Sequence, residues 1–205
     1  MTSLLLLSMF AAQSADLKFV STGMTSKMGG YVPIRAEMSA VAPVITKKPE
    51  GLKAPMYGTV QAGGKNFIFI LDEPDGEPAK LYVDSNGDGD LTNDPAPVWN
   101  AQKRGEMTMY NGTIEVMVGT NKATMGAYRF DKNDPARVQL KNTLLYYPDF
   151  GYSGTAKFGD ETLPIAFSGA PAGDSRVWID RNKNGKSDGR SEMIVANRPF
   201  NFGGT

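Results

Sequence analysis

The chain contains neither cysteine nor histidine among its 205 residues. Their absence excludes disulfide bonds, thiol nucleophiles, imidazole general bases and zinc sites built from thiolate or imidazole ligands. Any reaction chemistry is therefore limited to carboxylate, hydroxyl and amine groups. The lack of disulfides does not fix the compartment, because a secreted protein with a large enough core folds without them.

The chain also has no net charge, because 22 basic side chains balance 22 acidic ones. The overall charge thus gives no electrostatic reason to expect nucleic acid or an anionic membrane as partner. Beyond the N-terminus, no stretch reaches the length of about 20 apolar residues that a membrane-spanning helix needs. We therefore expect no nucleic-acid binding and no membrane span. The length suggests one or two domains.

What is present at the N-terminus is a short apolar run, from Leu4 to Ala12, followed by small residues. This pattern is typical of a secretory signal peptide cleaved after Ser14 or Ala15, although no Lys or Arg precedes the run. We predict a signal peptide over residues 1–15 and a secreted, periplasmic or cell-surface location. The alternative is a buried N-terminal segment.

The rest of the chain alternates short runs rich in Val, Ile, Phe and Tyr with Gly, Asn, Asp and Pro, which predicts an all-β fold of sandwich or barrel-like units. No window shows a capped helical stripe. Asn111-Gly112 lies between two apolar runs, so we expect a hairpin turn there. Residues 41–55, with three prolines, predict a surface connection. The expected strands lie in residues 31–38, 66–71, 80–83, 113–118 and 138–147.

The chain resembles itself when it is shifted by 96 positions. LYVDSNGDG from Leu81 then aligns with VWIDRNKNG from Val177, and Gly58-Thr59 aligns with Gly154-Thr155, without a gap. Such self-similarity predicts two tandem related repeats. We expect N-terminal strands and a connection over 16–50, a first β repeat over 51–147, and a partial second repeat over 148–205. Strands from the N-terminal region, such as 31–38, are candidates to complete the second repeat.

Each predicted repeat carries an Asp/Asn-rich loop after a strand. With the first Asp of each loop as position 1, oxygen-bearing side chains occupy positions 1, 3 and 5 and glycine occupies position 6. Alternate side chains and a backbone carbonyl then converge on a hard cation, as in an EF-hand loop. The candidate calcium ligands are Asp84, Asn86, Asp88, Asp90, Thr92 and Asp94 in the first loop, and Asp180, Asn182, Asn184, the carbonyl of Lys186 and Asp188 in the second.

Both loops depart from the full EF-hand, because position 12 holds Pro95 or Ser191 in place of a bidentate glutamate. No amphipathic helices flank them. They resemble the short DxDxDG loops of dockerins and thrombospondin type 3 repeats, over about ten residues per loop. The resemblance implies calcium and a structural role, and it does not extend to the folds or partners of those families. In the first loop, Asp94 at position 11 is a candidate for the missing carboxylate.

Local charge separates the two loops. Residues 72–94 contain eight acids and one base, whereas residues 176–192 contain three acids and five bases. Because calcium affinity grows with ligand charge, we expect the first loop to bind more tightly, with Kd on the order of 0.1–1 mM. The alternative is that Asp, Asn and Gly form ordinary turns without metal.

Other features offer less specific chemistry. The adjacent acids Asp72-Glu73 and Asp160-Glu161 could serve glycoside hydrolysis, but solvated surface charge is the better interpretation. Trp178 precedes the second loop on a predicted strand, which suits packing, and Trp99 could lie on a rim that binds a glycan. No phosphate-binding glycine loop and no nucleophile elbow is present.

From these patterns we expect an exported, calcium-binding structural or interaction protein without enzymatic activity, whose partner is a protein or a glycan. Two alternatives remain open from the sequence. One is an accessory module, possibly glycan-binding, of a longer exported enzyme. The other is a hydrolase with a carboxylate-only site.

Overall fold

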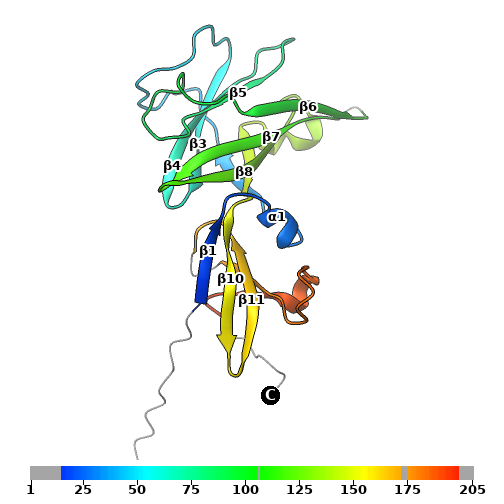
Figure 1. Cartoon of the computed structure of the whole chain (residues 1–205). Helices are drawn as coiled ribbons and strands as arrows, with labels where there is room; N and C mark the ends of the chain where they lie inside the picture. Colours follow the sequence, from blue (N-terminus) through cyan, green and yellow to red (C-terminus); the bar gives the residue numbers. More distant parts are fainter. Residues whose placement is uncertain (1–14, 106, 172–174, 199–205) are drawn as a thin grey trace, which may run out of the picture.

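The protein is described here from a computed structural model, which covers residues 15–105, 107–171 and 175–198. The predicted signal peptide, except for Ala15, lies outside these residues. The described chain is built almost entirely of antiparallel strands in three sheets, which confirms the all-β class (Figure 1). Within it, no helix is long and apolar enough to cross a membrane.

Two of the sheets form the upper part of the molecule in Figure 1. Sheet B has the strand order β2-β9-β8-β7-β6, and sheet C has the order β3-β4-β5. In sheet B the strands are β2 (Ile34–Glu37), β6 (Val98–Arg104), β7 (Met107–Val118), β8 (Asn121–Phe130) and β9 (Thr143–Pro148). In sheet C they are β3 (Pro55–Ala62), β4 (Lys65–Asp72) and β5 (Lys80–Val83).

Sheets B and C pack face to face around the largest hydrophobic core, as in a β-sandwich. Alternate residues of β4 point into this core, with Phe67, Phe69 and Leu71 nearly inaccessible to solvent. Ile114 and Val116 of β7 meet them from the opposite sheet. Residues 67–71 form a continuous apolar run, and such short apolar runs are the signal from which the strands are predictable.

Sheet A forms the lower part of Figure 1, with the order β1-β10-β11-β12-β13. A short helix, α1 (Met24–Lys27), packs on it and buries Met24 beside Trp178. Asp149 ties this corner to the upper part, because its carboxylate accepts hydrogen bonds from Thr22 Oγ1, Gly23 N and Thr25 N. The strands are β1 (Ala15–Val20), β10 (Gly151–Phe158), β11 (Glu161–Ser168), β12 (Arg176–Ile179) and β13 (Met193–Val195).

Sheets A and C share the spacing seen in the sequence. Strands β10, β11 and β12 begin and end 96 residues after β3, β4 and β5. The units diverge after their loops, because β13 pairs with β12 whereas β6 pairs with β7. The common bounds are a structural fact, and descent from one duplicated unit stays a prediction.

The prediction of a hairpin turn at Asn111-Gly112 is wrong. Both residues lie inside the long strand β7, paired with β6 on one side and β8 on the other. Glycine is needed there for close approach, since a Cβ at Gly112 would lie 1.8 Å from the carbonyl oxygen of Val98. The chain reverses between β6 and β7 just after Arg104, where Gly105 has φ +63°.

Two other strand predictions need correction. Residues 138–147 are not one strand, because a 3-10 helix, η1 (Pro135–Leu140), occupies the first part; Pro135 starts it and the Asp134 carboxylate accepts a bond from Ala136 N. Of residues 31–38 only Ile34–Glu37 is a strand, and it pairs with β9 in sheet B, so it does not complete the second repeat as predicted. The strand that joins β10 in sheet A is β1. The predicted connection at 41–55 is largely exposed, with Val44 96% accessible.

Candidate functional site

The first acidic loop, residues 84–94, follows β5 and is held together by side chains that fold back onto the backbone. Asp84 is buried, and its carboxylate accepts bonds from the N–H groups of Gly87, Asp88 and Gly89 at 2.8–3.1 Å. Asn86 Oδ1 accepts from Asp88 N at 2.8 Å. These bonds compensate for the burial of Asp84 and curl the loop around it.

The same turn repeats along the loop. Asp88 Oδ1 accepts a bond from Asp90 N at 2.7 Å, and Asp90 Oδ1 accepts from both the N–H and the hydroxyl of Thr92. Side chains at positions 1, 3, 5 and 7 thus all face back into the loop, as Asx turns require. The structure therefore brings Asp84, Asn86, Asp88 and Asp90 into one succession of turns.

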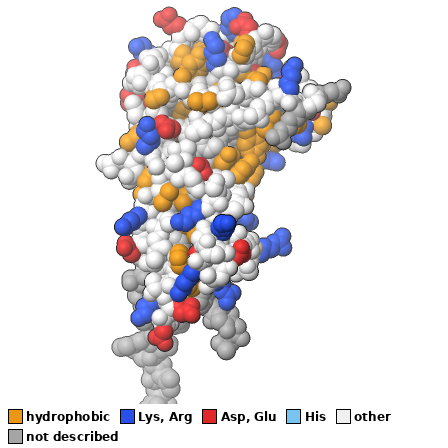
Figure 2. All heavy atoms as spheres, turned by 45° about the vertical axis from the view of Figure 1, so that its right-hand side comes forward, with side chains coloured by type: hydrophobic (Ala, Val, Ile, Leu, Met, Phe, Trp, Pro, Cys, Tyr) orange, Lys and Arg blue, Asp and Glu red, His pale blue; other side chains and the backbone are white. Residues whose placement is uncertain are grey.

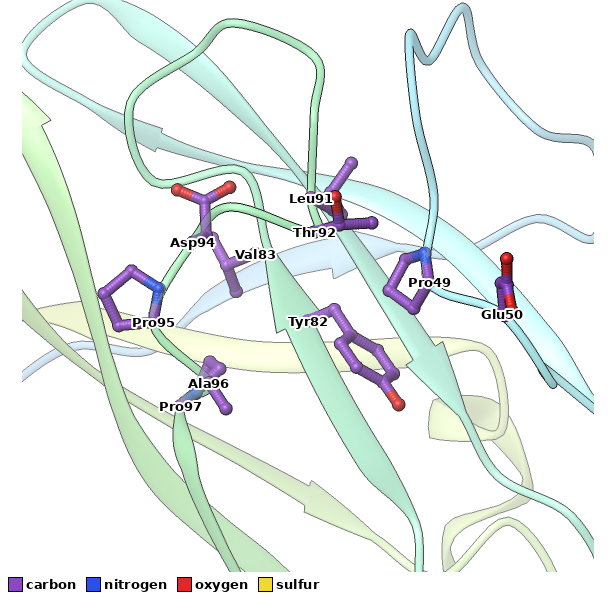
Figure 3. Close-up of a pocket in the computed structure, with 10 residues that line it drawn as sticks. All are labelled: Pro49, Glu50, Tyr82, Val83, Leu91, Thr92, Asp94, Pro95, Ala96 and Pro97. Carbon is purple, nitrogen blue, oxygen red and sulfur yellow. The ribbon is translucent and has the colours of Figure 1, made fainter.

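Asp94 closes the loop. Its Oδ1 accepts bonds from the N–H and the hydroxyl of Ser85, at 3.0 and 2.5 Å. Its Oδ2 is buried and has no hydrogen-bond partner among the described residues. Figure 3 shows the carboxylate pointing toward the arch of the loop and away from Pro95. The predicted role of Asp94 in place of position 12 stays a prediction.

The electrostatics of the loop follow from these contacts. Burial raises the pKa of Asp94, and the nearby negative charges of Asp84 and Asp88 raise it further against the bonds from Ser85. The hydrogen bond from the Asn93 amide lowers the pKa of Asp88, and the bonds from Thr92 lower that of Asp90. Asp94 is thus the acid of this loop whose ionised form is least satisfied.

Part of the predicted surface connection covers the loop, which the sequence did not reveal. Thr46 N and Lys47 N donate to the carbonyl of Gly89, and Leu91 N donates to that of Lys47. Ile45 and Leu52 pack against a small core that includes Leu91. A hollow of about 310 Å³ lies beside the loop, lined by Pro49, Tyr82, Asp94 and others (Figure 3).

The second loop, residues 180–188, repeats the same backbone path. Asp180 is buried and accepts bonds from Asn184 N and Gly185 N. Asn182 Oδ1 accepts from Asn184 N, and Asn184 Oδ1 accepts from Lys186 N. At position 4 the left-handed conformation of Gly87, φ +80°, is adopted by Lys183, φ +57°. A residue with a Cβ is strained in this conformation.

The carboxylates of the second loop already have donors. Asp188 Oδ2 accepts from the side-chain amides of Asn182 and Asn184, at 2.6 and 3.0 Å. Buried Glu192 accepts from Arg181 N, Asp188 N and Trp178 Nε1 at 3.0–3.1 Å. Burial alone would raise the pKa of Glu192, but these donors hold it below its ordinary value.

Glu192 is the residue that the sequence reasoning missed. It binds the N–H of position 2, as Asp94 does in the first loop. It lies 98 residues after Asp94, not 96, so the gap-free alignment hides the match. Its second oxygen is fully partnered, whereas the second oxygen of Asp94 is not. The Asp94 carboxylate therefore keeps one oxygen without a hydrogen-bond donor, whereas the Glu192 carboxylate has donors for both oxygens.

Within the described residues, no three acidic side chains form a ready-made metal cluster. The loops nevertheless fit calcium by donor type, because Asn oxygens and backbone carbonyls count among its ligands. The unpartnered oxygen of Asp94 makes the first loop the better fit.

No protein-family model, curated protein or solved structure matches this chain. Its site must therefore be understood from its own geometry.

The adjacent acids considered for hydrolysis have different environments. Asp72 and Glu73 are buried, so their interpretation as surface charge is wrong. Asp72 accepts bonds from Lys53 N and Ala54 N, and Glu73 pairs with buried Arg129, with Nη2 2.8 Å from Oε2. Asp160 and Glu161 are exposed at the β10–β11 turn, as expected.

The two tryptophans differ in burial, because Trp178 is fully buried and Trp99 only partly. Trp178 is 1% exposed and packs with Met24, Met28 and Ala166, which confirms its packing role. Trp99 is partly buried against the main core and stacks on Tyr110 at 6.2 Å between ring centroids. The prediction that Trp99 lies on a glycan-binding rim stays a prediction.

Proposed function

We propose that this chain is an exported calcium-binding β-protein in which the ion rigidifies loop 84–94 and the segment that covers it. The observation that carries the proposal is the buried, unpartnered Oδ2 of Asp94, close to the negative charges of Asp84 and Asp88. A divalent cation turns this repulsion into coordination. The protein then acts as a structural or interaction module, with a protein or glycan as partner.

The first loop is the principal site in this proposal. It has the greater excess of acids, and the carboxylates of the second loop are occupied by amide and N–H donors. A cation at the second loop would have to displace those donors. We therefore expect weaker binding there, in line with its lower ligand charge.

The predicted export supports the proposal that the first loop binds calcium. The apolar run from Leu4 to Ala12 is typical of a signal peptide. Calcium near 1 mM outside cells suffices for a loop with Kd on the order of 0.1–1 mM. The same loop would stay largely empty at cytosolic calcium levels.

Thermal unfolding of the metal-free protein tests the proposal. At a calcium concentration ten times Kd, an ion that binds only the folded loop adds about 1.4 kcal/mol. For a chain of this size we expect the unfolding midpoint to rise by roughly 3–6 °C. Magnesium should raise it much less, since it prefers rigid octahedral sites.

Matched variants locate the effect. Asp94→Asn keeps an oxygen for Ser85 but removes the charge, and we expect it to lose most of the calcium response. Asp188→Asn makes the same change in the second loop and should keep most of it. Asp72→Ala should lower stability with and without calcium but preserve the shift. An unshifted wild-type midpoint, or an unchanged response in Asp94→Asn, would contradict the proposal.

A further inference from the structure

A second cleft of the described chain lies away from the calcium loop proposed above. It has a volume of about 920 Å³ and opens between the segment that follows α1 and the β12–β13 end of sheet A. Residues 28–32 and Ile34 line one wall, and residues of η2 (Gly189–Glu192) and β13 line the other. The walls meet where Gly29 approaches Ser187, since a Cβ on Gly29 would lie 3.2 Å from the serine side chain.

The first wall is apolar and open to solvent. Tyr31, Val32 and Ile34 have 48%, 55% and 42% of their surface exposed. The opposite wall includes the half-buried side chains of Met193 and Val195, whereas the side chain of Ile194, between them, packs with Ile165 and Ile179 in another cluster. Such exposed apolar walls suit the apolar side chains of a partner.

The cleft is also positively charged. Arg176 and Arg190 line it, and none of its lining residues is acidic. Neither arginine forms an ion pair within the described part of the chain. The two acids that flank Arg190 in sequence, Asp188 and Glu192, are engaged by internal donors. Figure 2 shows Lys and Arg side chains distributed over the lower part of the molecule.

One side of the cleft is the sheet edge formed by β13, where Met193 N already donates to Arg190 O and Val195 O accepts from Arg198 N. Among the described strands, β13 is the last of sheet A and pairs only with β12. The two arginines flank it, because Arg190 lies in η2 just before β13 and Arg176 is the cross-strand partner of Val195. An extended chain can add to such an edge through backbone hydrogen bonds while its side chains enter the neighbouring cleft.

We propose that this cleft binds an extended acidic peptide segment, which adds to β13 as a further strand and places carboxylates on Arg176 and Arg190. The edge supplies backbone pairing, the walls take aliphatic side chains, and the guanidinium groups select acidic partners by bidentate hydrogen bonds. This site is independent of the proposed calcium loop.

The test is fluorescence anisotropy with labelled nine-residue peptides and the full protein at constant calcium. The probe alternates valine and glutamate. A second peptide has lysine in place of glutamate, and a third keeps glutamate but carries N-methyl groups on alternate amides, which removes strand pairing and leaves the charge. We expect saturable binding of the first peptide alone.

The protein variants separate local from general charge effects. Arg176→Gln combined with Arg190→Gln should weaken binding of the valine-glutamate peptide about tenfold. Lys65→Gln combined with Lys80→Gln removes the same charge from sheet C and should change binding less than twofold. The far-ultraviolet circular dichroism of both double variants should match that of the parent.

Four results would overturn the proposal. They are no binding of the valine-glutamate peptide, equal binding by the arginine double variant, equal binding of the N-methylated peptide, or saturable binding of an anionic polysaccharide such as polygalacturonate in its place. The first two remove the arginine site, the third removes strand addition, and the fourth assigns the cleft to a glycan.

Discussion

At the residue scale, the two Asp/Asn loops differ in the hydrogen bonding of a single carboxylate oxygen. Asp94 and Glu192 both close an Asp/Asn loop on the N–H of its second residue, yet only Glu192 has donors for both oxygens. A buried carboxylate oxygen without a partner is costly, and this cost is what a cation relieves. The first loop is therefore a candidate ion site, whereas the second loop satisfies its closing carboxylate with its own hydrogen-bond donors.

Two glycines of the first loop make a matched pair for testing how the covering segment contributes. Gly87 and Gly89 have nearly the same φ, +80° and +82°, so alanine at either should cost about 1–2 kcal/mol. Only at Gly89 would the new Cβ meet a neighbour, Thr46 Oγ1 at 2.8 Å. We expect Gly89→Ala to lose about 1 kcal/mol more than Gly87→Ala in urea unfolding. Equal losses would mean that the segment around Thr46 moves aside freely.

At the element scale, a buried ion pair joins the end of β4 to β8. Arg129 is 2% exposed and binds Glu73 through Nε and Nη2, while its Nη1 and Nη2 also donate to the carbonyls of Thr143 and Lys141. Lys132 Nζ donates to the carbonyl of Glu73. The pair thus fixes how sheet C and the β8–β9 connection meet.

Removing one member of this pair should be severe, because the other charge stays buried without a partner. We expect Glu73→Gln and Arg129→Met each to cost about 3–5 kcal/mol in denaturant unfolding. Glu73→Leu combined with Arg129→Met should cost clearly less than the sum of the single changes. The exposed pair Lys122–Glu115, on adjacent strands, is the control, and its removal should cost less than about 1 kcal/mol. Similar losses at both pairs would refute this role.

At the scale of the whole molecule, balanced charge means that stability near neutral pH depends on local clusters more than on overall repulsion. The pKa of Asp94 is raised above the ordinary value of 3.8 by burial and neighbouring acids. In the metal-free protein its contribution is present at low pH and is lost as pH rises through the raised folded-state pKa. Bound calcium favours the ionised form and should reverse this sign.

Unfolding free energies of the wild type and Asp94→Asn, measured from about pH 3.5 to pH 7, check this sign. Without metal, the unfolding free energy of the wild type should fall relative to that of the variant as the pH rises from about 3.8, the ordinary pKa of an aspartate. With saturating calcium it should gain. The same pH dependence in both conditions would show that Asp94 does not contact the ion.

The sequence by itself determined the features that depend on neighbouring residues. Short apolar runs bounded by turn residues indicate strands β4 and β5, because such runs are typical of buried strands. The Asp, Asn and Gly spacing places the two loops, since Asx turns form between residues two apart. Asn111-Gly112 shows the limit of such local rules, because a typical turn pair lies within a strand paired on both sides.

Only the tertiary structure decided which distant residues meet. Glu73 and Arg129 are 56 positions apart, and each is typical of a surface until the two are seen buried together. Ala15 pairs with Ala156, so the strand that completes sheet A comes from the other end of the described chain. The free oxygen of Asp94 and the cleft beside β13 likewise arise from packing between segments. Local sequence patterns do not predict these contacts, because the energy of the contacts comes from burial and from the geometry of the partners, which only the folded chain provides.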